Sequence, residues 1–402
     1  MTTGPQLAFR AIDADNHFYE NRDSFTRHLE PQFEEQAIHL VGEGPKAYWM
    51  VGERRYSFSN INNVDWAPAP GSREDFFAAK EDQGFVERSG VEMIDPKEHP
   101  PLVDQRSRLA LMDDQGLEAI IQVPTMAVML EPDFTLSDDG WYANIRAFNR
   151  WVEEEWGFGA DGRIFSTALI SPRNPDLAVE ELERVAAAGA RFVVLGKAGP
   201  IQGRSPADRM FDRFWAAISD LDLITVQHIG NSGYTELFSA AWGEDPHPFL
   251  RDLSPFQHFS CLIDRPIADT MANLVLNNLF GRFPRLKMVV LEYGSRWVWD
   301  LLPGIDKAAK MGAQGRWPGG RFSDLPSDVF KEHVWVSPFP EEDPVALLEM
   351  LPADRLLFGS DFPHSEGLRE PLTYAGKLAG LDDQTVHAIM RGNAAKLMGL
   401  AA

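Results

Sequence analysis

Residues 163–195 read RIFSTALISPRNPDLAVEELERVAAAGARFVVL. The two ends of this stretch, Arg163–Ile170 and Ala190–Gly196, are short and rich in Val, Ile and Leu, which is typical of strands buried on both faces. Asp176–Ala188, between them, carries apolar residues at helical spacing, and Gly189 follows as a favourable helix end. The order strand, helix, strand predicts an α/β protein.

The same alternation runs through the chain. Helical patterns occur at Asp104–Gln115, Arg209–Asp220 and Ile267–Phe280. The predicted strands are Ala8–His17, Leu117–Pro124, Arg163–Ile170, Ala190–Gly196, Leu223–His228, Leu286–Glu292, His333–Ser337 and Arg355–Asp361. Eight strands alternating with helices favour a (β/α)8 TIM barrel, with a doubly wound sheet as the competing architecture. We therefore expect residues 1–402 to form a single barrel domain.

One part of the chain does not fit the alternation. About 85 residues separate the first predicted strand from the helix at Asp104–Gln115, and long structureless loops are uncommon in compact domains. We expect residues 30–100 to form a lid or small subdomain inserted after strand 1. Arg54 and Arg55 in this insertion are candidates for holding a substrate carboxylate, or else form a solvated run of charge.

Composition excludes several classes of protein. The 402 residues include 38 Lys and Arg against 60 Asp and Glu, so the formal net charge is −22. Such a surface repels phosphate backbones and anionic lipid, which argues against a nucleic-acid or membrane partner. The N-terminus has no signal pattern, and the single cysteine, Cys261, excludes an internal disulfide and a thiolate metal site. We expect a cytoplasmic protein.

Groups able to bind metal stand at the ends of four predicted strands. Asp13, Asp15 and His17 alternate along strand 1 and should share a face, because side chains alternate across a strand. The other strand ends carry His228, Glu292, and Asp361 followed by His364. Each residue alone has an ordinary structural explanation, such as a capped core histidine or a salt-bridge acid. Together they predict a metal site, since all strand ends of a barrel meet at one mouth.

The order and spacing of several motifs carry a resemblance to a family. They are IDADNHFYE (12–20), RLALMDDQGLEAIIQVPT (108–125), ITVQHIG (224–230), LFGRFPRLKMVVLEYGSRWVWDLL (279–302), LLFGSDFPHSEG (356–367) and IMRGNAAKLMGL (389–400). The chain resembles the amidohydrolase 2 branch of the metal-dependent amidohydrolase superfamily, which includes aminocarboxymuconate-semialdehyde and γ-resorcylate decarboxylases.

The resemblance implies a set of functional residues. Asp15, His17, His228 and Asp361 would bind a divalent metal, and Asp361 would also carry a proton, with His364 assisting. Two departures stand out. The first strand offers Asp-x-His where much of the superfamily has His-x-His, and Glu292 stands where several decarboxylases offer a histidine. Glu292 is therefore a candidate for a catalytic or a metal-binding role.

The remaining candidates concern the ion and the substrate. Zinc is the expected metal, with iron or manganese as alternatives, and Glu292 and Glu20 would allow a second ion. Arg296 and Trp297 are the predicted substrate contacts. Other aromatic residues that could line the pocket are Trp49, Trp66, Trp242 and Phe362.

These residues predict a metal-dependent hydrolase or non-oxidative decarboxylase acting on a small aromatic or cyclic carboxylate. A metal-bound water or a metal-polarised substrate oxygen would drive either reaction. The alternatives are a non-haem, dinuclear iron oxygenase on the same fold, or a binding protein without catalysis. We expect a homo-oligomer, either a dimer or a tetramer.

Overall fold

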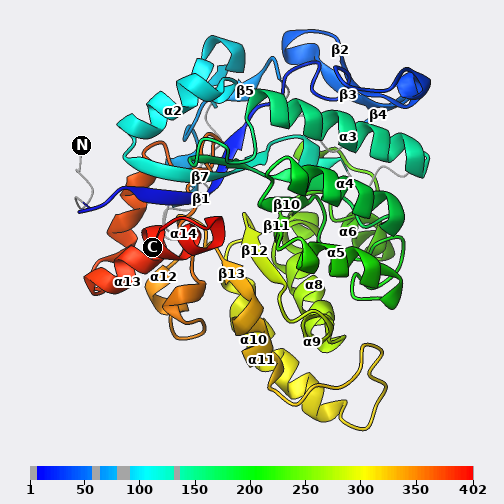
Figure 1. Ribbon diagram of the computed structural model, residues 1–402, viewed down its shortest axis with the longest axis vertical. Helices are drawn as coiled ribbons and strands as arrows, with labels where there is room; N and C mark the ends of the chain where they lie inside the picture. Colours follow the sequence, from blue (N-terminus) through cyan, green and yellow to red (C-terminus); the bar gives the residue numbers. More distant parts are fainter. Residues whose placement is uncertain (1–6, 57–63, 79–90, 131–135, 402) are drawn as a thin grey trace.

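The computed structural model describes residues 7–56, 64–78, 91–130 and 136–401. Two parallel sheets form its centre, one in the order β1-β7-β8 and the other in the order β13-β12-β11-β10-β9. Their strands are β1 (Ala11–Phe18), β7 (Leu117–Pro124), β8 (Ile164–Ser166), β9 (Ala168–Ile170), β10 (Phe192–Leu195), β11 (Ile224–His228), β12 (Lys287–Leu291) and β13 (Val334–Val336). Helices pack around these strands, as Figure 1 shows.

The predicted third strand, Arg163–Ile170, passes from one sheet to the other. It divides at Thr167 into β8, which pairs with β7, and β9, which pairs with β10. The two sheets are therefore continuous through this stretch of chain.

The predicted eighth strand, Arg355–Asp361, is not a regular strand, although its backbone still connects the two sheets. Leu357 N donates to Val336 O (3.0 Å) on one side, and Ala14 N donates to Phe358 O (2.8 Å) on the other. Asp361 N donates to Asp15 O (2.8 Å), and single parallel bridges join Val336 to Leu356 and Asn16 to Phe362. We call residues 356–362 the seam, because they join β13 to β1.

The helices agree with the sequence patterns, with shifted ends. The helix expected at Asp176–Ala188 is α4 (Pro175–Ala187), which starts at the capping side chain of Asn174. The helix expected at Ile267–Phe280 divides into α8 and α9. The remaining helices around the sheets are α2 (Gln105–Asp114), α3 (Asp138–Glu155), α5 (Asp212–Asp220), α6 (Tyr234–Leu237), α7 (Pro255–Gln257), α8 (Asp264–Leu276), α9 (Leu279–Arg282), α10 (Arg296–Met311), α11 (Pro326–His333), α12 (Pro344–Leu347), α13 (Asp383–His387) and α14 (Asn393–Met398).

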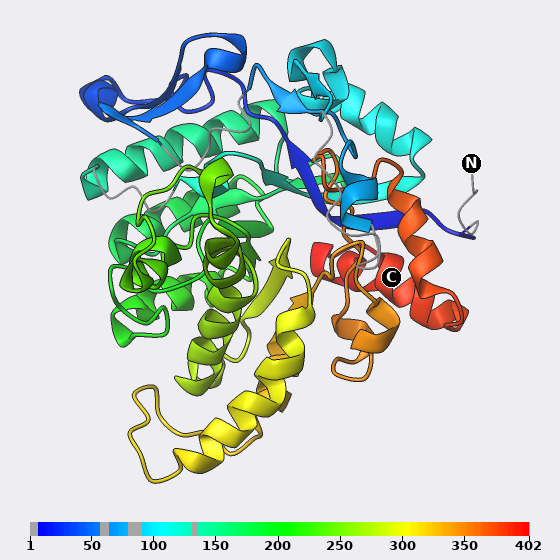
Figure 2. The same cartoon turned by 180° about the vertical axis from the view of Figure 1, so that it is seen from behind.

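The insertion between β1 and α2 contains small antiparallel sheets. They comprise β2 (Ile38–Val41), β3 (Tyr48–Val51), β4 (Arg54–Arg55), β5 (Ala67–Pro68) and β6 (Met93–Ile94), with the short helix α1 (Glu74–Ala78). In Figure 2 this part lies at the edge of the molecule, beside α2 and α3. Parts of the predicted 30–100 segment, residues 57–63 and 79–90, lie outside the described residues.

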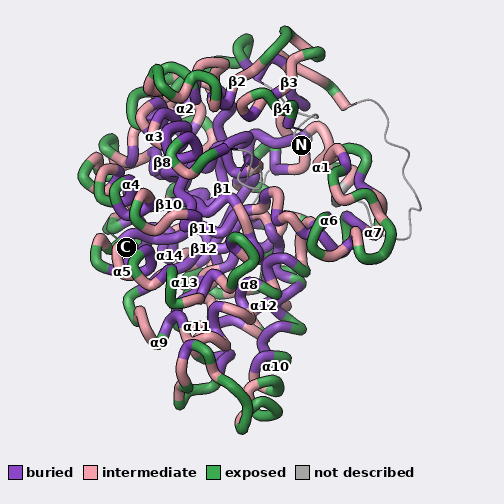
Figure 3. Tube along the Cα trace, turned by 90° about the vertical axis from the view of Figure 1, so that its right-hand side faces the viewer, coloured by how far each residue is buried: buried purple, intermediate pink, exposed green. Residues whose placement is uncertain are grey.

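The core runs through the strands and the inner faces of the helices. Figure 3 shows the central strands buried and the exposed residues gathered at the periphery. The side chains of β1 are buried along its whole length, including Asp13, Asp15 and His17. Among the described residues, no helix combines the length and apolar character needed to cross a membrane. The burial of two acids and an imidazole on β1 needs a physical explanation, because buried charged groups are costly unless they are paired.

A substitution at Gly359 would test how closely the seam must approach β1. A Cβ at this position would lie 2.5 Å from Ser337 Oγ and 2.6 Å from Asp15 Cβ. We expect Gly359→Ala to lower the free energy of unfolding by roughly 1–3 kcal/mol, the usual cost of overpacking. The control is Gly376→Ala, because a Cβ added there would meet no other part of the chain within 4 Å. Urea unfolding measures both, and equal stability of the two variants would contradict the tight seam.

Candidate metal centre

Five side chains from four separate segments of the chain meet in one place. Asp15 and His17 come from β1, His228 ends β11, Glu292 follows β12 and Asp361 ends the seam. His17 Nε2 lies 3.4 Å from Asp15 Oδ1, 3.5 Å from Glu292 Oε2 and 3.4 Å from Asp361 Oδ1. His228 Nε2 lies 3.0 Å from Glu292 Oε2 and 3.6 Å from Asp15 Oδ1. We call these five residues the donor cluster.

Four atoms of the donor cluster lack hydrogen-bond partners. Within the described part of the chain, Asp15 Oδ1, His17 Nε2, His228 Nε2 and Glu292 Oε2 are buried without one. Leaving a buried polar atom unpaired costs about 1–3 kcal/mol. Four such atoms facing one another are the arrangement expected around a cation, and their donor set of imidazole and carboxylate suits a divalent transition metal.

The spacing of the donor atoms fits the same conclusion. With metal–ligand distances of about 2.1 Å, neighbouring ligand atoms are separated by about 3.0 Å in an octahedron and about 3.4 Å in a tetrahedron. The five nitrogen-to-oxygen separations given above run from 3.0 to 3.6 Å. The residues present therefore fit a bound ion.

Backbone conformation aims two of the acids. Glu292 has φ 53° and Asp361 has φ 57°, both in the left-handed region. Non-glycine residues seldom adopt this region, and they concentrate at functional sites when they do. In both cases the chain turns directly after an apolar segment, which brings the carboxylate into the cluster. Composition and spacing carry no signal of this turn.

A hydrogen bond orients the imidazole of His228. Its Nδ1 lies 2.9 Å from the carbonyl oxygen of Ile229. A carbonyl can only accept, so Nδ1 carries a proton and Nε2 is the nitrogen that faces the donor cluster. His228 is therefore oriented so that Nε2 would be its metal-binding atom.

His364 belongs to a chain of hydrogen bonds that starts at Asp361. Thr125 Oγ1 donates its only proton to Phe18 O (2.8 Å), so it must accept from His364 Nε2 at 3.1 Å. The other ring nitrogen, Nδ1, faces Asp361 Oδ1 at 2.7 Å. This short contact requires a proton between the two atoms. The Asp361–His364 pair therefore holds one transferable proton beside the donor cluster.

Burial and mutual charge shift the pKa values in the cluster. Burial raises the pKa of Asp361 well above its ordinary value, and the charge of Glu292 adds to the effect. Burial alone would also raise the pKa of Asp15, but the imidazoles of His17 and His228 hold it well below the usual range. Burial lowers the pKa of His17, whereas the acids around His228 overcome burial and raise its pKa. These opposed shifts follow from acids and imidazoles that are buried close to one another.

Two predicted acids lie outside the donor cluster. The pairing of β1 with β7 shifts register between Asp13 and Asn16, so the strict alternation expected for Asp13, Asp15 and His17 does not hold. Asp13 instead accepts hydrogen bonds from Asn16 and Ser360. Glu20, predicted as a further ligand, accepts from the backbone amides of Met126 and Ala127 (2.7 and 2.9 Å), and burial raises its pKa to about 7.

A pocket of about 360 Å³ opens beside the donor cluster and reaches Glu292 and Asp361. Its other charged or titratable residues are Arg73, Arg251, His258, Glu341 and Glu366. Its apolar residues are Phe76, Ile229, Leu250, Leu262, Ile263, Phe339 and Pro340. Sequence reasoning noted Glu366, which follows the seam, as an acid near the site. It missed the other wall residues, because they come from the insertion and from the loops after β11 and β13. His258 starts a π-helical turn, a feature frequent at functional sites.

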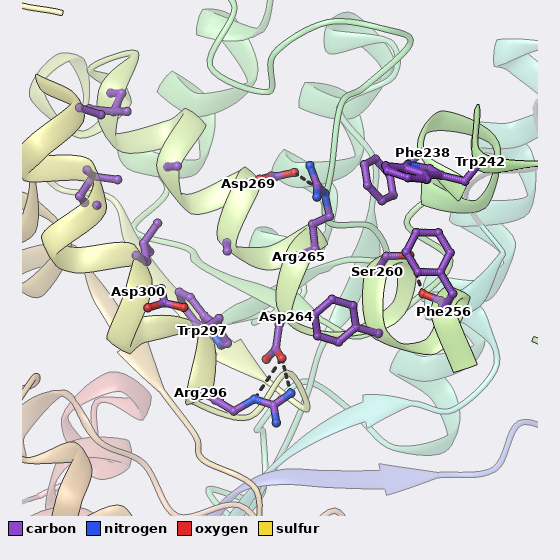
Figure 4. A pocket seen from close by; sticks show the side chains of 18 residues that line it. Phe238, Trp242, Phe256, Ser260, Asp264, Arg265, Asp269, Arg296, Trp297 and Asp300 are labelled. Carbon is purple, nitrogen blue, oxygen red and sulfur yellow. Dashed lines mark hydrogen bonds and ion pairs between the residues drawn. The ribbon is translucent and has the colours of Figure 1, made fainter. Parts of the chain in front are cut away.

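The predicted substrate contacts lie elsewhere. Figure 4 shows Arg296 pointing to Asp264, in a groove of about 750 Å³ between α8 and α10 that Trp297 also lines. Arg296 Nη2 lies 2.6 Å from Asp264 Oδ2, and Trp297 Nε1 donates to Gly294 O (2.9 Å). Neither residue lines the pocket beside the donor cluster.

The other candidates are likewise absent from the walls of that pocket. Trp49 packs on Phe25 in the core, and Phe362 belongs to a small core cluster with Tyr19. Trp242 is 71% exposed in the groove of Figure 4. The pocket does not include Trp66, Arg54 or Arg55.

Comparison with known proteins places the chain in a family. The amidohydrolase family model matches residues 12–400, so the chain belongs to the amidohydrolase family. Membership of this metal-dependent family also implies a TIM barrel. No curated protein sequence gives a significant match.

Solved structures agree. A crystal structure of an amidohydrolase from Mycobacterium avium subsp. paratuberculosis K-10 is 33% identical, with 98% of this chain and 100% of that chain covered, at a TM-score of 0.88. 5-Carboxyvanillate decarboxylase from Novosphingobium aromaticivorans, complexed with manganese and a nitrobenzoic acid, is 16% identical, covers 99% and 98%, and has a TM-score of 0.61. Dihydroxybenzoic acid decarboxylase from Polaromonas, with bound manganese and 2-nitroresorcinol, is 18% identical, covers 97% of each chain, and also has a TM-score of 0.61. At these lower identities the likeness concerns the fold.

Removal of either imidazole should empty the centre. We expect His17→Ala and His228→Ala each to reduce the metal content of the purified protein about tenfold or more, because each removes a buried nitrogen that faces the cluster. The control is His333→Ala, since His333 is also buried but lies just before β13 and bonds to Leu286 O. Elemental analysis of the three proteins measures the effect. Full metal occupancy in either cluster variant would refute the assignment.

Glu292 decides between one ion and two. Two overlapping groups of donor atoms occur among the described residues, and both contain His17 and Glu292. Glu292 would therefore either bind a single ion or bridge two, and we expect a single ion. We expect Glu292→Gln to weaken metal binding about tenfold or more while the saturating stoichiometry stays at about one per chain. Titration followed by elemental analysis measures both quantities, and a fall from two ions to one would instead show a dinuclear centre.

Proposed function

We propose that this amidohydrolase-family enzyme is a metal-dependent, non-oxidative decarboxylase of a small aromatic or cyclic carboxylate. The observation that carries the proposal is the set of unpartnered buried donor atoms from Asp15, His17, His228 and Glu292, next to a pair that holds a proton. The decarboxylase structures, whose ligands are a nitrobenzoic acid and 2-nitroresorcinol, support the substrate class. The volume of the pocket, about 360 Å³, suits a molecule with a single ring.

In such a reaction the residues of the donor cluster and the Asp361–His364 pair would have different roles. Asp15, His17, His228, Glu292 and Asp361 would hold a divalent ion, which would supply the positive charge that polarises substrate oxygens. When the bond between the ring carbon and the carboxyl group breaks, carbon dioxide leaves and the electron pair stays on the ring carbon.

That carbon then needs a proton. The Asp361–His364 pair holds one between Asp361 Oδ1 and His364 Nδ1, and the bond from His364 Nε2 to Thr125 fixes the ring. The pair is therefore proposed as the proton donor, which is replenished from solvent.

The outer wall of the pocket would select an anion. Arg73, Arg251 and His258 line it together with apolar side chains such as Phe76 and Phe339. Guanidinium groups bind carboxylates in a two-pronged geometry, and apolar walls suit a ring. The two guanidinium groups would give an anionic substrate a local partner, in a pocket that also holds Glu341 and Glu366 and in a protein whose net charge is −22.

We also propose that the insertion covers the mouth of the pocket. Arg73 and Phe76 belong to the insertion and line the pocket together with Glu292 and Asp361. The backbone supports the same placement, because Gly71 N donates to His364 O (3.0 Å) and Arg73 N donates to Ser365 O (2.7 Å). The segment at 71–76 thus docks on the chain just after Asp361, where a cover over the site would have to lie.

The identity of the ion is part of the proposal. The donor cluster contains two imidazoles and three carboxylates, a set that suits zinc, iron or manganese. Zinc remains our prediction from the sequence, and manganese, present in two of the decarboxylase structures, is its main competitor. Elemental analysis of protein purified without chelator distinguishes them.

The test is a substrate screen in deuterated water. Protein loaded with manganese or zinc should release carbon dioxide from at least one hydroxybenzoate and place deuterium on the carbon that loses the carboxyl group. Asp361→Asn should lower kcat at least about 100-fold, because positioned proton transfer contributes a factor of roughly that size or more.

A matched pair of arginine variants checks the substrate side. Arg251→Ala should raise KM, whereas Arg296→Ala in the distant groove should leave it unchanged. Hydrolysis of esters, lactones or amides without any release of carbon dioxide would replace the decarboxylase proposal by a hydrolase. Oxygen consumption would point to the oxygenase instead.

A further inference from the structure

We propose that Asp13 is a positioning residue for the metal centre: its buried carboxylate sets the distance between Asp15 and His17 on β1 and Asp361 on the seam. The inference rests on the metal centre of the proposed function. Asp13 is fully buried and does not belong to either group of donor atoms around the ion site.

The carboxylate of Asp13 accepts four hydrogen bonds from two segments far apart in sequence. Oδ1 accepts from Asp15 N (3.1 Å) and from Ser360 N (2.9 Å). Oδ2 accepts from Asn16 Nδ2 (2.9 Å) and from Ser360 Oγ (2.5 Å). Two of these donors belong to β1, beside the ligands Asp15 and His17, and two belong to the residue directly before Asp361. One carboxylate therefore joins the segment that carries Asp15 and His17 to the segment that carries Asp361.

The orientation of Asn16 is fixed by a second buried residue. Arg108 Nη1 donates to Asn16 Oδ1, and a guanidinium can only donate. The amide of Asn16 is therefore held with its oxygen toward Arg108 and its nitrogen toward Asp13. Arg108 is itself buried and donates from Nε to Pro101 O (2.6 Å), so this orientation is anchored outside the metal centre.

This arrangement requires a carboxylate at position 13. An asparagine there would offer one oxygen and one amino group to four donors. If its oxygen faced the two backbone amides, its amino group would face Asn16 Nδ2, which Arg108 prevents from turning. Two donors would then oppose each other in a buried site, and β1 and the seam would separate. The position of Asp361 relative to His17 would change with them.

The experiment measures Mn²⁺ binding to the wild-type protein and to folded variants of it. We expect Asp13→Asn to weaken Mn²⁺ binding by about 10–100-fold, the range found when a partner behind the metal ligands is removed. The electron paramagnetic resonance spectrum of the bound Mn²⁺ should also change, because the ligand geometry changes. In the double variant Asp13→Asn with Asn16→Asp, the new carboxylate accepts from both Arg108 and the new amide, so most of the affinity and the original spectrum should return.

Asp65→Asn is the matched control. Asp65 is a buried carboxylate with ion pairs to Arg22 and Lys97 and no place in the donor groups, so its loss should leave Mn²⁺ affinity and spectrum unchanged even if the melting temperature falls. If Asp13→Asn does not fold, Ser360→Ala takes its place. That variant removes one of the four bonds and should weaken Mn²⁺ binding less strongly than the range expected for Asp13→Asn.

The outcomes separate the two proposals. Wild-type affinity and an unchanged spectrum in folded Asp13→Asn, or in Ser360→Ala if it replaces that variant, would overturn the positioning role while leaving the metal centre intact. An equal loss of affinity in Asp65→Asn would overturn it as well, because the effect would then be general destabilisation. Failure of the double variant to bind Mn²⁺ better than Asp13→Asn would refute the hydrogen-bond arrangement on which the role depends. Absence of Mn²⁺ and Zn²⁺ binding by the wild-type protein would overturn the proposed function itself.

Discussion

Mutual repulsion among buried acids is the constraint on which the site depends. Asp15, Glu292 and Asp361 each lie within 3.5 Å of the same nitrogen, His17 Nε2. Three carboxylates this close cannot all be ionised in a buried environment unless positive charge is placed among them. Two imidazoles supply part of that charge, and a divalent cation would supply the rest. The strand ends are thus arranged around a charge that the polypeptide itself does not carry.

The fold meets this constraint by anchoring each ligand separately. His228 is oriented by Ile229 O, and Glu292 and Asp361 by left-handed turns directly after apolar segments. The seam is the least regular connection between the two sheets, because residues 356–362 pair with β1 and β13 only through isolated bridges and single backbone hydrogen bonds. Its place is secured by side chains instead, above all by Ser360 against Asp13. The irregular seam therefore allows Asp361 a conformation that a regular strand would forbid.

The sequence predicted most of the elements and the centre of the site, for physical reasons. Strands buried on both faces are apolar throughout, so Leu117–Pro124 was predicted with its bounds as observed, and the predicted strand ends carried His228 and Asp361. The seam was predicted as a strand because LLFG has strand composition, although hydrogen bonding there is irregular. Asp13 was expected to share a face with Asp15 and His17, but the register of β1 shifts after Asp13, and its carboxylate bonds to Asn16 and Ser360 instead. Such register shifts depend on tertiary pairing, which a single sequence does not display.

The walls of the pocket could not be predicted in the same way. Arg73, Phe76, Arg251 and His258 come from an insertion and from a loop, where no periodicity links a residue to the strand ends. Arg296 was expected at the site because it follows Glu292 closely in sequence, yet after the left-handed turns at Glu292 and Gly294 it lies in the groove between α8 and α10. The candidate ligands thus stand on strand ends and the seam, whereas most of the pocket walls come from the insertion and from loops. For this reason the candidate metal ligands can be read from the strand pattern, whereas the substrate contacts must be read from the insertion and the loop after β11.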